Sequence, residues 1–196
     1  MNNELYEACG SGNIEKCIEL LKYDKIDINK TNNYGCTALY TACSNNSLEI
    51  VKLLLNDKRL DVNKGDDDGW TAFYTACLHD NLEIVKLLLN EPRIDVNKTN
   101  YKGLTPLDTA CEDNYIKIIE ILLRNPRINI DKINESVELS NEVKIMYESY
   151  KNIKRDKMSD RKLAVFMAFA DGNIYVKNKE SKYISQSKKT IKVKEY

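Results

Sequence analysis

Residues 69–89 read GWTAFYTACLHDNLEIVKLLL, and residues 35–55 read GCTALYTACSNNSLEIVKLLL. Over the longer windows 33–64 and 67–98 the two segments are identical at 21 of 32 positions. The step between them is 34 residues, and the same step separates Cys9, Cys43, Cys77 and Cys111. A fixed period of this kind indicates internal duplication. The sequence therefore predicts four repeated units, at about 1–30, 33–64, 67–98 and 101–132.

Each unit has the pattern of two short helices. In the second unit Thr37 is a good N-cap, and Leu39, Ala42 and Cys43 fall on one face of a helix that begins there. A second helix is expected at residues 48–55, with its buried stripe at Ile50, Val51, Leu54 and Leu55. The helix pair is too small to bury its apolar face alone, so the units are expected to stack into an all-α solenoid.

The residues between and after the helices have turn chemistry. Asn46, Asp80, Asn114 and Gly12 occupy the same place in the four units and tolerate the left-handed conformation that a tight turn between helices needs. Residues 61–69 combine Asx-turn side chains with a glycine. We expect an extended finger with a turn at its tip.

These segments, together with Asp95-Val96-Asn97, resemble the ankyrin repeat, whose signature is G-x-T-P-L-H-x-A-A followed by I-V-x-L-L-L and D-V-N. The resemblance covers residues 1 to about 132 and implies an ankyrin solenoid with short β-turn fingers. Only the fourth unit keeps the proline, at Pro106, and an extra residue lengthens the loop after the second helix. Tyr40, Tyr74 and Asp108 replace the usual histidine, so its hydrogen bond between repeats is expected to pass to Tyr or Asp or to water.

The reactive residue types do not assemble a catalytic or metal site. The chain has one histidine, His79, seven glycines and no C-x-x-C pair, so no zinc site, nucleophile set or phosphate-binding loop is expected. The four periodic cysteines and Cys17 are interpreted as small buried hydrophobic residues. Cys36 precedes a helix and has a partly exposed, reactive thiol as an alternative. The sequence predicts no enzyme activity, no cofactor and no small-molecule substrate.

Candidate partner-binding residues follow from the differences between the two most similar units. Apart from the core pair Leu39 and Phe73, these differences fall at the finger tip, the end of the first helix and the back loop. In ankyrin proteins the first two lie on the concave face, where partners bind. The resemblance therefore implies a site made of Asn33, Tyr34, Cys36, Ser44, Asn45, Asp67, Asp68, Trp70, Leu78, His79, Tyr101, Lys102, Leu104, Glu112 and Asp113.

Two readings of this candidate site stay open. Trp70 beside Tyr34 and Tyr101 has the composition of an interface hot spot, with Leu78 adding apolar area, or else it packs against its neighbouring finger. The carboxylates of residues 66–68 and 112–113 form either a solvated surface or a site for a basic partner. Asn63 and Asn97 match a pattern for Asn hydroxylation known in the family, although turn capping explains them equally well.

The period fails from Ile133 onward. Residues 136–151 are predicted to be helical, within a capping helix at 133–152 that closes the end of the stack. A basic extension, 153–196, is expected to be partly disordered. Within it, residues 163–176 favour a helix, with a hairpin or a decayed repeat as alternatives.

The net charge is zero because an acidic region and a basic region cancel. Residues 1–132 hold 16 Lys and Arg against 21 Asp and Glu, whereas residues 133–196 hold 14 against 9. The longest apolar run, residues 163–170, is far shorter than the roughly 20 residues that span a bilayer. With no secretory signal recognisable, we expect an intracellular protein, cytoplasmic or in a host cytoplasm if it is viral or a secreted effector.

The predicted function is a non-catalytic scaffold or adaptor that binds a protein partner on the concave face. By analogy with viral and bacterial ankyrin proteins, a host-directed role is one possibility. The alternative is nucleic-acid or anionic-surface binding through the lysines of residues 177–194.

Overall fold

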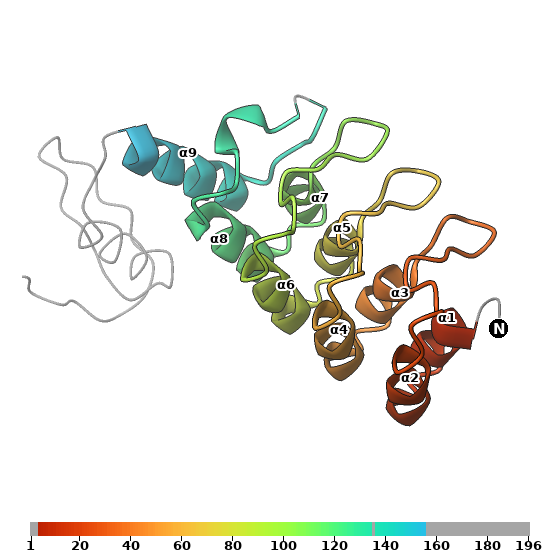
Figure 1. The fold of residues 1–196 in the computed structure, drawn as a ribbon. Coiled ribbons are helices and arrows are strands. Elements are labelled where there is room, and N and C mark those ends of the chain that lie inside the picture. The colour runs from red at the N-terminus through yellow and green to blue at the C-terminus, as the bar shows by residue number, and fades with distance from the viewer. Residues whose placement is uncertain (1–3, 135, 156–196) are drawn as a thin grey trace, which may run out of the picture. The chain divides into compact units, whose positions relative to one another are not determined.

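The computed structural model describes residues 4–134 and 136–155. The chain divides into two units, residues 1–144 and 145–196, and each is described by itself. The first unit is a stack of helical hairpins (Figure 1). Its helices are α1 (Glu4–Gly10), α2 (Ile14–Leu21), α3 (Ala38–Ser44), α4 (Leu48–Leu55), α5 (Ala72–Leu78), α6 (Leu82–Leu89), α7 (Pro106–Glu112) and α8 (Ile116–Arg124), followed by a 3-10 turn at Ile130–Lys132. The predicted all-α repeat fold is confirmed.

The odd-numbered helices form one row of the stack and the even-numbered helices form the other (Figure 1). Threonine side chains start α3, α5 and α7, because the hydroxyls of Thr37, Thr71 and Thr105 each accept a backbone N–H three residues later at 3.1 Å. Between the paired helices the chain turns through a left-handed residue, with φ between 53° and 71°, at Gly12, Asn46, Asp80 and Asn114. The turn residues expected from the sequence are therefore confirmed.

Each finger is an Asx turn that precedes an odd-numbered helix. In the first one, the Oδ1 atom of Asn32 accepts the N–H groups of Tyr34 and Cys36 at 2.9 and 3.0 Å. Antiparallel bridges close two of the fingers, between Thr31 and Thr37 and between Gly65 and Thr71. Neighbouring fingers touch, since the N–H of Asp67 donates to the Tyr34 carbonyl at 3.2 Å. At Gly35, whose φ is +75°, a Cβ would lie 2.6 Å from the backbone nitrogen of Asp67.

The core follows the predicted stripes with one difference. Ile50, Val51 and Leu54 are at most 1% exposed, whereas Leu55, predicted to be buried with them, is half-buried. Leu55 lies at the last position of α4, where the helix gives way to the back loop. The four periodic cysteines and Cys17 are all buried, at 0 to 2% exposure, as free thiols.

Tyrosine and aspartate take the place of the missing histidine. The amide Nδ2 of Asn32 donates to the Tyr6 hydroxyl at 2.9 Å, across the boundary between the first two repeats. Asn100 donates in the same way to Tyr74 at 3.2 Å. In the fourth repeat the Oδ1 atom of Asp108 accepts the N–H of Asn134 at 2.8 Å. The bonds of Tyr74 and Asp108 are direct, which answers for these two positions the question that the sequence left open.

The loops after α4, α6 and α8 carry a second set of bonds between repeats. The guanidinium groups of Arg59, Arg93 and Arg127 donate to carbonyls of the preceding repeat, with Arg93 Nη2 at 2.8 Å from the Leu55 oxygen. Asn63 spans the same boundary, between the second and third repeats, with both ends of its amide: it donates to the Arg93 carbonyl and accepts the Asp95 N–H, each at 2.7 Å. Asn29 and Asn97 repeat this arrangement.

Helix α9 (Asn141–Arg155) begins five residues later than the predicted start at Ser136. The reason is local: Asn134 Oδ1 accepts the N–H of Ser136 at 3.0 Å, which makes another Asx turn, and the Ser140 hydroxyl accepts the N–H of Val143 at 3.3 Å. Val143 is fully buried in the first unit. In the second unit the expected apolar face of α9 is also buried, at Met146, Tyr147 and Tyr150.

The capping role of α9 stays a prediction. Residues 156–196 lie outside the described part of the chain, and with them the expectations for segment 163–176 and the lysine-rich tail. Among the described helices, none has the length and apolar content needed to cross a bilayer.

Candidate protein-binding face

The fifteen candidate residues lie on two recurring features of the first unit. One is the finger tips, residues 33–36, 67–70 and 101–104, and the other is the C-terminal ends of α3, α5 and α7, residues 44–45, 78–79 and 112–113. We call this surface the finger face. Each of the fifteen side chains is exposed or half-buried, so all of them are accessible to a partner.

Aromatic side chains stand out on the finger tips. Tyr34 and Tyr101 are 75% and 80% exposed, among the most exposed large apolar side chains in the described part of the chain. Trp70 is half-buried, and its ring stacks on Tyr74 with 5.5 Å between ring centroids and 20° between planes. The indole therefore packs on the first turn of its own helix α5 and still presents part of its surface to solvent. This geometry holds the ring in place before any partner arrives.

Carboxylates surround these rings. Asp67 and Asp68 are exposed at the tip of the middle finger, and Glu112 and Asp113 are exposed at the end of α7. Burial raises the pKa of the Tyr74 hydroxyl, and the nearby charges of Glu112, Asp108 and Asp113 raise it further. The carboxylates at the end of α7 therefore lie close enough to influence the residue on which Trp70 stacks.

Cys36 does not have the environment of a reactive thiol. Partial burial raises its pKa, and the neighbouring carboxylates of Asp66 and Asp67 raise it further. A reactive cysteine needs the opposite, a lowered pKa in an electropositive setting. Cys36 is thus a small, half-buried side chain of the finger face.

Asn45 already has a structural partner. Its Nδ2 atom donates to the carbonyl oxygen of Gly10 at 3.0 Å and so joins the end of α3 to the end of α1. The sequence identified this position from its variation between repeats, but it could not show that the amide spans two repeats.

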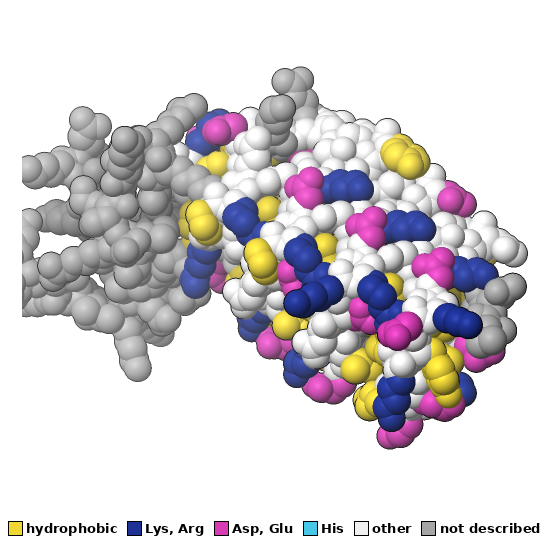
Figure 2. Space-filling model, viewed as in Figure 1, with side chains coloured by type: hydrophobic (Ala, Val, Ile, Leu, Met, Phe, Trp, Pro, Cys, Tyr) yellow, Lys and Arg dark blue, Asp and Glu magenta, His cyan; other side chains and the backbone are white. Residues whose placement is uncertain are grey.

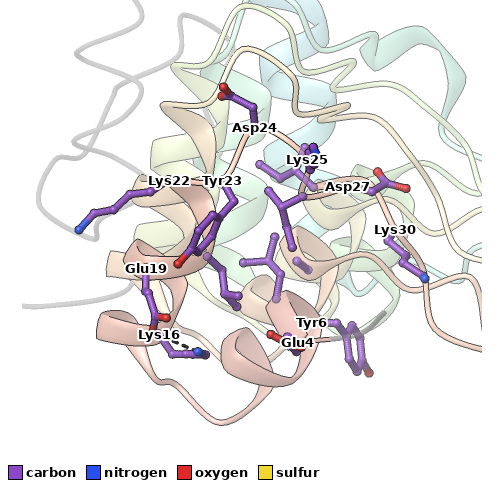
Figure 3. Close-up of a pocket in the computed structure, with 15 residues that line it drawn as sticks. Glu4, Tyr6, Lys16, Glu19, Lys22, Tyr23, Asp24, Lys25, Asp27 and Lys30 are labelled. Carbon is purple, nitrogen blue, oxygen red and sulfur yellow. Dashed lines mark hydrogen bonds and ion pairs between the residues drawn. The ribbon is translucent and has the colours of Figure 1, made fainter. Parts of the chain in front are cut away.

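A groove of about 880 Å³ that the sequence did not predict lies on the first repeat (Figure 3). Its walls come from α1, α2, the loop that follows α2, and Ala38 at the start of α3. Charged side chains of both signs line it in equal number, with Lys16, Lys22, Lys25 and Lys30 against Glu4, Glu19, Asp24 and Asp27. Lys16 and Glu19 form an ion pair at 3.0 Å.

Comparison with the next repeat explains the groove. Glu4, Lys16 and Glu19 occupy the positions of Ala38, Ile50 and Leu53 in the second repeat. Ile50 is buried there at 1% exposure, whereas the Lys16 and Glu19 side chains are 41% and 54% exposed. Charged residues thus cover the outer side of the first repeat, as in a terminal repeat that faces water. The groove therefore lies on a charged surface of the first repeat.

No metal centre emerges from the geometry. In residues 4–134 and 136–155, no group of three His, Cys, Asp or Glu side chains could hold a metal ion. Acidic and basic side chains lie interspersed on the surface that Figure 2 shows. The finger face thus combines aromatic and acidic side chains that are exposed or half-buried.

Comparison with known proteins gives one result. The family model for ankyrin repeats (3 copies) matches residues 2–66 and 58–134. No curated protein matches the chain. Ankyrin repeats are generally protein-protein interaction modules, and proteins of this kind are typically non-enzymatic.

Proposed function

The chain belongs to the ankyrin repeat family, and from this premise we propose that it is a non-catalytic scaffold that binds a protein partner on its finger face. The observation that carries the proposal is the set of accessible aromatic rings at Tyr34, Trp70 and Tyr101 on adjacent fingers. Two of these rings are exposed, and the third is held by stacking on Tyr74.

Variation between the repeats supports the same surface. The second and third repeats are identical in their second helices, yet they differ at both features of the finger face. Most of the differences fall at exposed or half-buried positions, apart from the buried pairs Leu39/Phe73 and Leu60/Ile94. Tyrosine and tryptophan are the residues most enriched at the centres of protein interfaces.

The charge of the surface favours a basic partner. Asp67, Asp68, Glu112 and Asp113 contribute four exposed carboxylates, against one exposed lysine, Lys102. A partner that presents Lys or Arg beside apolar side chains would match both parts of the surface, and its association would weaken with salt. We place this scaffold inside the cell, where it would act as an adaptor.

The test is affinity capture from a cell lysate followed by mass spectrometry. The bait is the full chain, compared with Trp70→Ala/Leu78→Ala on the finger face and with Lys52→Ala/Lys86→Ala on the exposed sides of α4 and α6. We expect the finger-face variant to lose partners that the matched control retains. If the finger-face variant keeps the same partners while both variants show the helical circular dichroism of the parent, the assignment is wrong.

A purified partner then allows a direct measurement. Trp70 is the only tryptophan in the chain, so its fluorescence reports on the finger face without a label. We expect its emission to change when the partner is titrated in, with weaker binding as salt is added. An unchanged emission at saturation would place the partner elsewhere.

A further inference from the structure

Two buried thiols meet inside the first repeat. Cys9 lies on α1 and Cys17 on α2, and their sulfur atoms are 3.7 Å apart. Both side chains are 0% exposed. The protein-binding face does not use either of them.

The pair is peculiar to the first repeat. Cysteine recurs at the position of Cys9 in all four repeats, but the position of Cys17 holds Val51, Val85 and Ile119 in the other three. Val51 and Val85 fill the same core slot at 0% exposure, so packing alone does not call for a sulfur atom there. The first repeat therefore has two thiols in contact, a pair that the other three repeats lack.

We propose that Cys9 and Cys17 form a reversible disulfide under oxidation by hydrogen peroxide, and that this disulfide joins α1 to α2 within the first repeat. A disulfide needs its sulfur atoms at about 2.05 Å, so they must approach by roughly 1.6 Å. The two cysteines face each other across a short helical hairpin, where side-chain rotation and a small shift of α1 can supply that movement.

The two thiols have different roles in the reaction. Either sulfur can donate their hydrogen bond. When Cys9 donates it, the bond raises the pKa of Cys9 and lowers that of Cys17, so Cys17 ionises first. Its thiolate sulfur attacks one peroxide oxygen and the O–O bond breaks. The departing hydroxide combines with the proton released from Cys17 to give water, and Cys17 becomes a sulfenic acid.

The second step closes the bond. Cys9 loses its proton, and its sulfur attacks the Cys17 sulfur and displaces hydroxide, which takes up that proton as a second water. The two thiols lose two electrons in total and the peroxide is reduced to two molecules of water. A dithiol such as dithiothreitol reverses the change by thiol–disulfide exchange.

The position of the pair gives the oxidant access. Each repeat of a solenoid is stabilised by its neighbours, and on the side of the first repeat that faces away from the second, the Lys16 and Glu19 side chains are 41% and 54% exposed. The first repeat is therefore expected to open locally more often than the second and third repeats, which contain Cys43 and Cys77. Those thiols are buried to the same degree, and the structure gives neither of them a sulfur hydrogen-bond partner such as Cys9 has.

The test treats the full chain with hydrogen peroxide, then denatures it, alkylates the remaining thiols and maps its peptides without reduction. We expect four alkylated cysteines instead of six, and a linked pair of peptides that contains Cys9 and Cys17 and has lost two hydrogens. Dithiothreitol should restore all six. Hydrogen exchange should slow at the amides of residues 4–21 in the oxidised chain.

Cys17→Val is the matched control, because valine fills this slot in the second and third repeats. It should show no linked peptide and no oxidant-dependent slowing of exchange. If it loses its helical circular dichroism, the peptide map of the parent chain alone decides. The proposal is overturned if Cys9 and Cys17 both remain free, if either is found only as a sulfinic acid, or if Cys36 cross-links two chains while the pair stays reduced.

Discussion

The hydroxyl of Thr109, on α7, donates a hydrogen bond to the hydroxyl of Tyr74, on α5. Both residues are buried, and the amide of Asn100 donates to the same Tyr74 oxygen at 3.2 Å. The Tyr74 hydroxyl oxygen thus accepts hydrogen bonds from two residues of the following repeat, one on a helix and one on a finger. The stacking of Trp70 on Tyr74 places the candidate binding face directly on this connection.

Tyr74→Phe should destabilise the array, because it leaves the buried Thr109 hydroxyl and Asn100 amide without their acceptor. Loss of one partner of a buried polar group costs about 1–3 kcal/mol. Urea denaturation followed by circular dichroism measures the change. The matched control is Tyr34→Phe, which removes a hydroxyl from a 75% exposed ring. Equal stability of the two variants would show that the Tyr74 hydroxyl does not link the repeats.

The period in the sequence predicts much of the fold for a physical reason. Helix 48–55, the Thr37 cap and the left-handed residue Asn46 depend on side chains close in sequence, so their pattern can be read locally. The bonds of Tyr74 join residues 26 and 35 positions apart, which only the stacking of repeats brings together. The sequence therefore could not identify the hydrogen-bond partners of Tyr74.

Other features escaped prediction for different reasons. Arg59, Arg93 and Arg127 follow the 34-residue step, but their acceptors are backbone carbonyls, which any residue supplies and no sequence pattern marks. The cysteines were compared between repeats, whereas the close sulfur contact of Cys9 and Cys17 lies within one repeat. The candidate binding residues were found from variation between repeats, which identifies outward-facing positions but not a partner.

Arg93→Ala should weaken the boundary between the second and third repeats. The guanidinium donates to the Leu55 carbonyl at 2.8 Å and pairs with Glu91 at 3.0 Å. We expect a loss of about 1–2 kcal/mol in the free energy of unfolding, from hydrogen bonds worth about 0.5–1.5 kcal/mol each. Thermal and urea denaturation both measure it.

Arg93→Lys separates charge from geometry, because lysine keeps the charge but lacks the planar fork that reaches two acceptors at once. Its stability should fall between that of the alanine variant and the parent. Lys86→Ala breaks an exposed ion pair with Glu83 and should change stability little. A lysine variant as stable as the parent would mean that charge alone matters at this boundary.

Lys16→Ile/Glu19→Leu should make the chain associate with itself. These substitutions restore the residues that the second repeat has at the same positions, where Ile50 is buried by its neighbour. On the first repeat they create an apolar surface suited to stacking, and large exposed apolar patches promote association. Sedimentation velocity should show a mass that rises with concentration.

The matched control for association is Glu83→Leu/Lys86→Ile, which replaces an equivalent exposed ion pair on α6 with the same two apolar residues. This surface does not take part in repeat stacking, so the control should associate less. Equal association of the two variants would show that added hydrophobicity, and not the stacking surface of the first repeat, is responsible.

Raising the pH should destabilise the array through its buried thiols. Burial raises the pKa of Cys43 and Cys77 well above the ordinary value of 9.0, and it raises the pKa of Cys111 to about 12. The unfolded chain then releases these protons at lower pH than the folded chain does. The stabilisation is complete below about pH 9 and is lost as the pH rises above it, by up to about 1.4 kcal/mol per pH unit for each thiol.

Cys77→Ala isolates one of these contributions. It lowers stability at neutral pH by removing a buried sulfur atom, but it should also make the fall in stability above about pH 9 shallower, by up to about 1.4 kcal/mol per pH unit. Urea denaturation at a series of pH values measures both slopes. Ionisation of Tyr40 and Tyr74, whose pKa values are also raised by burial, adds the same fall to both proteins and cancels in the comparison. Parallel curves for parent and variant would mean that the Cys77 thiol ionises as readily in the folded chain as in the unfolded one, contrary to its complete burial.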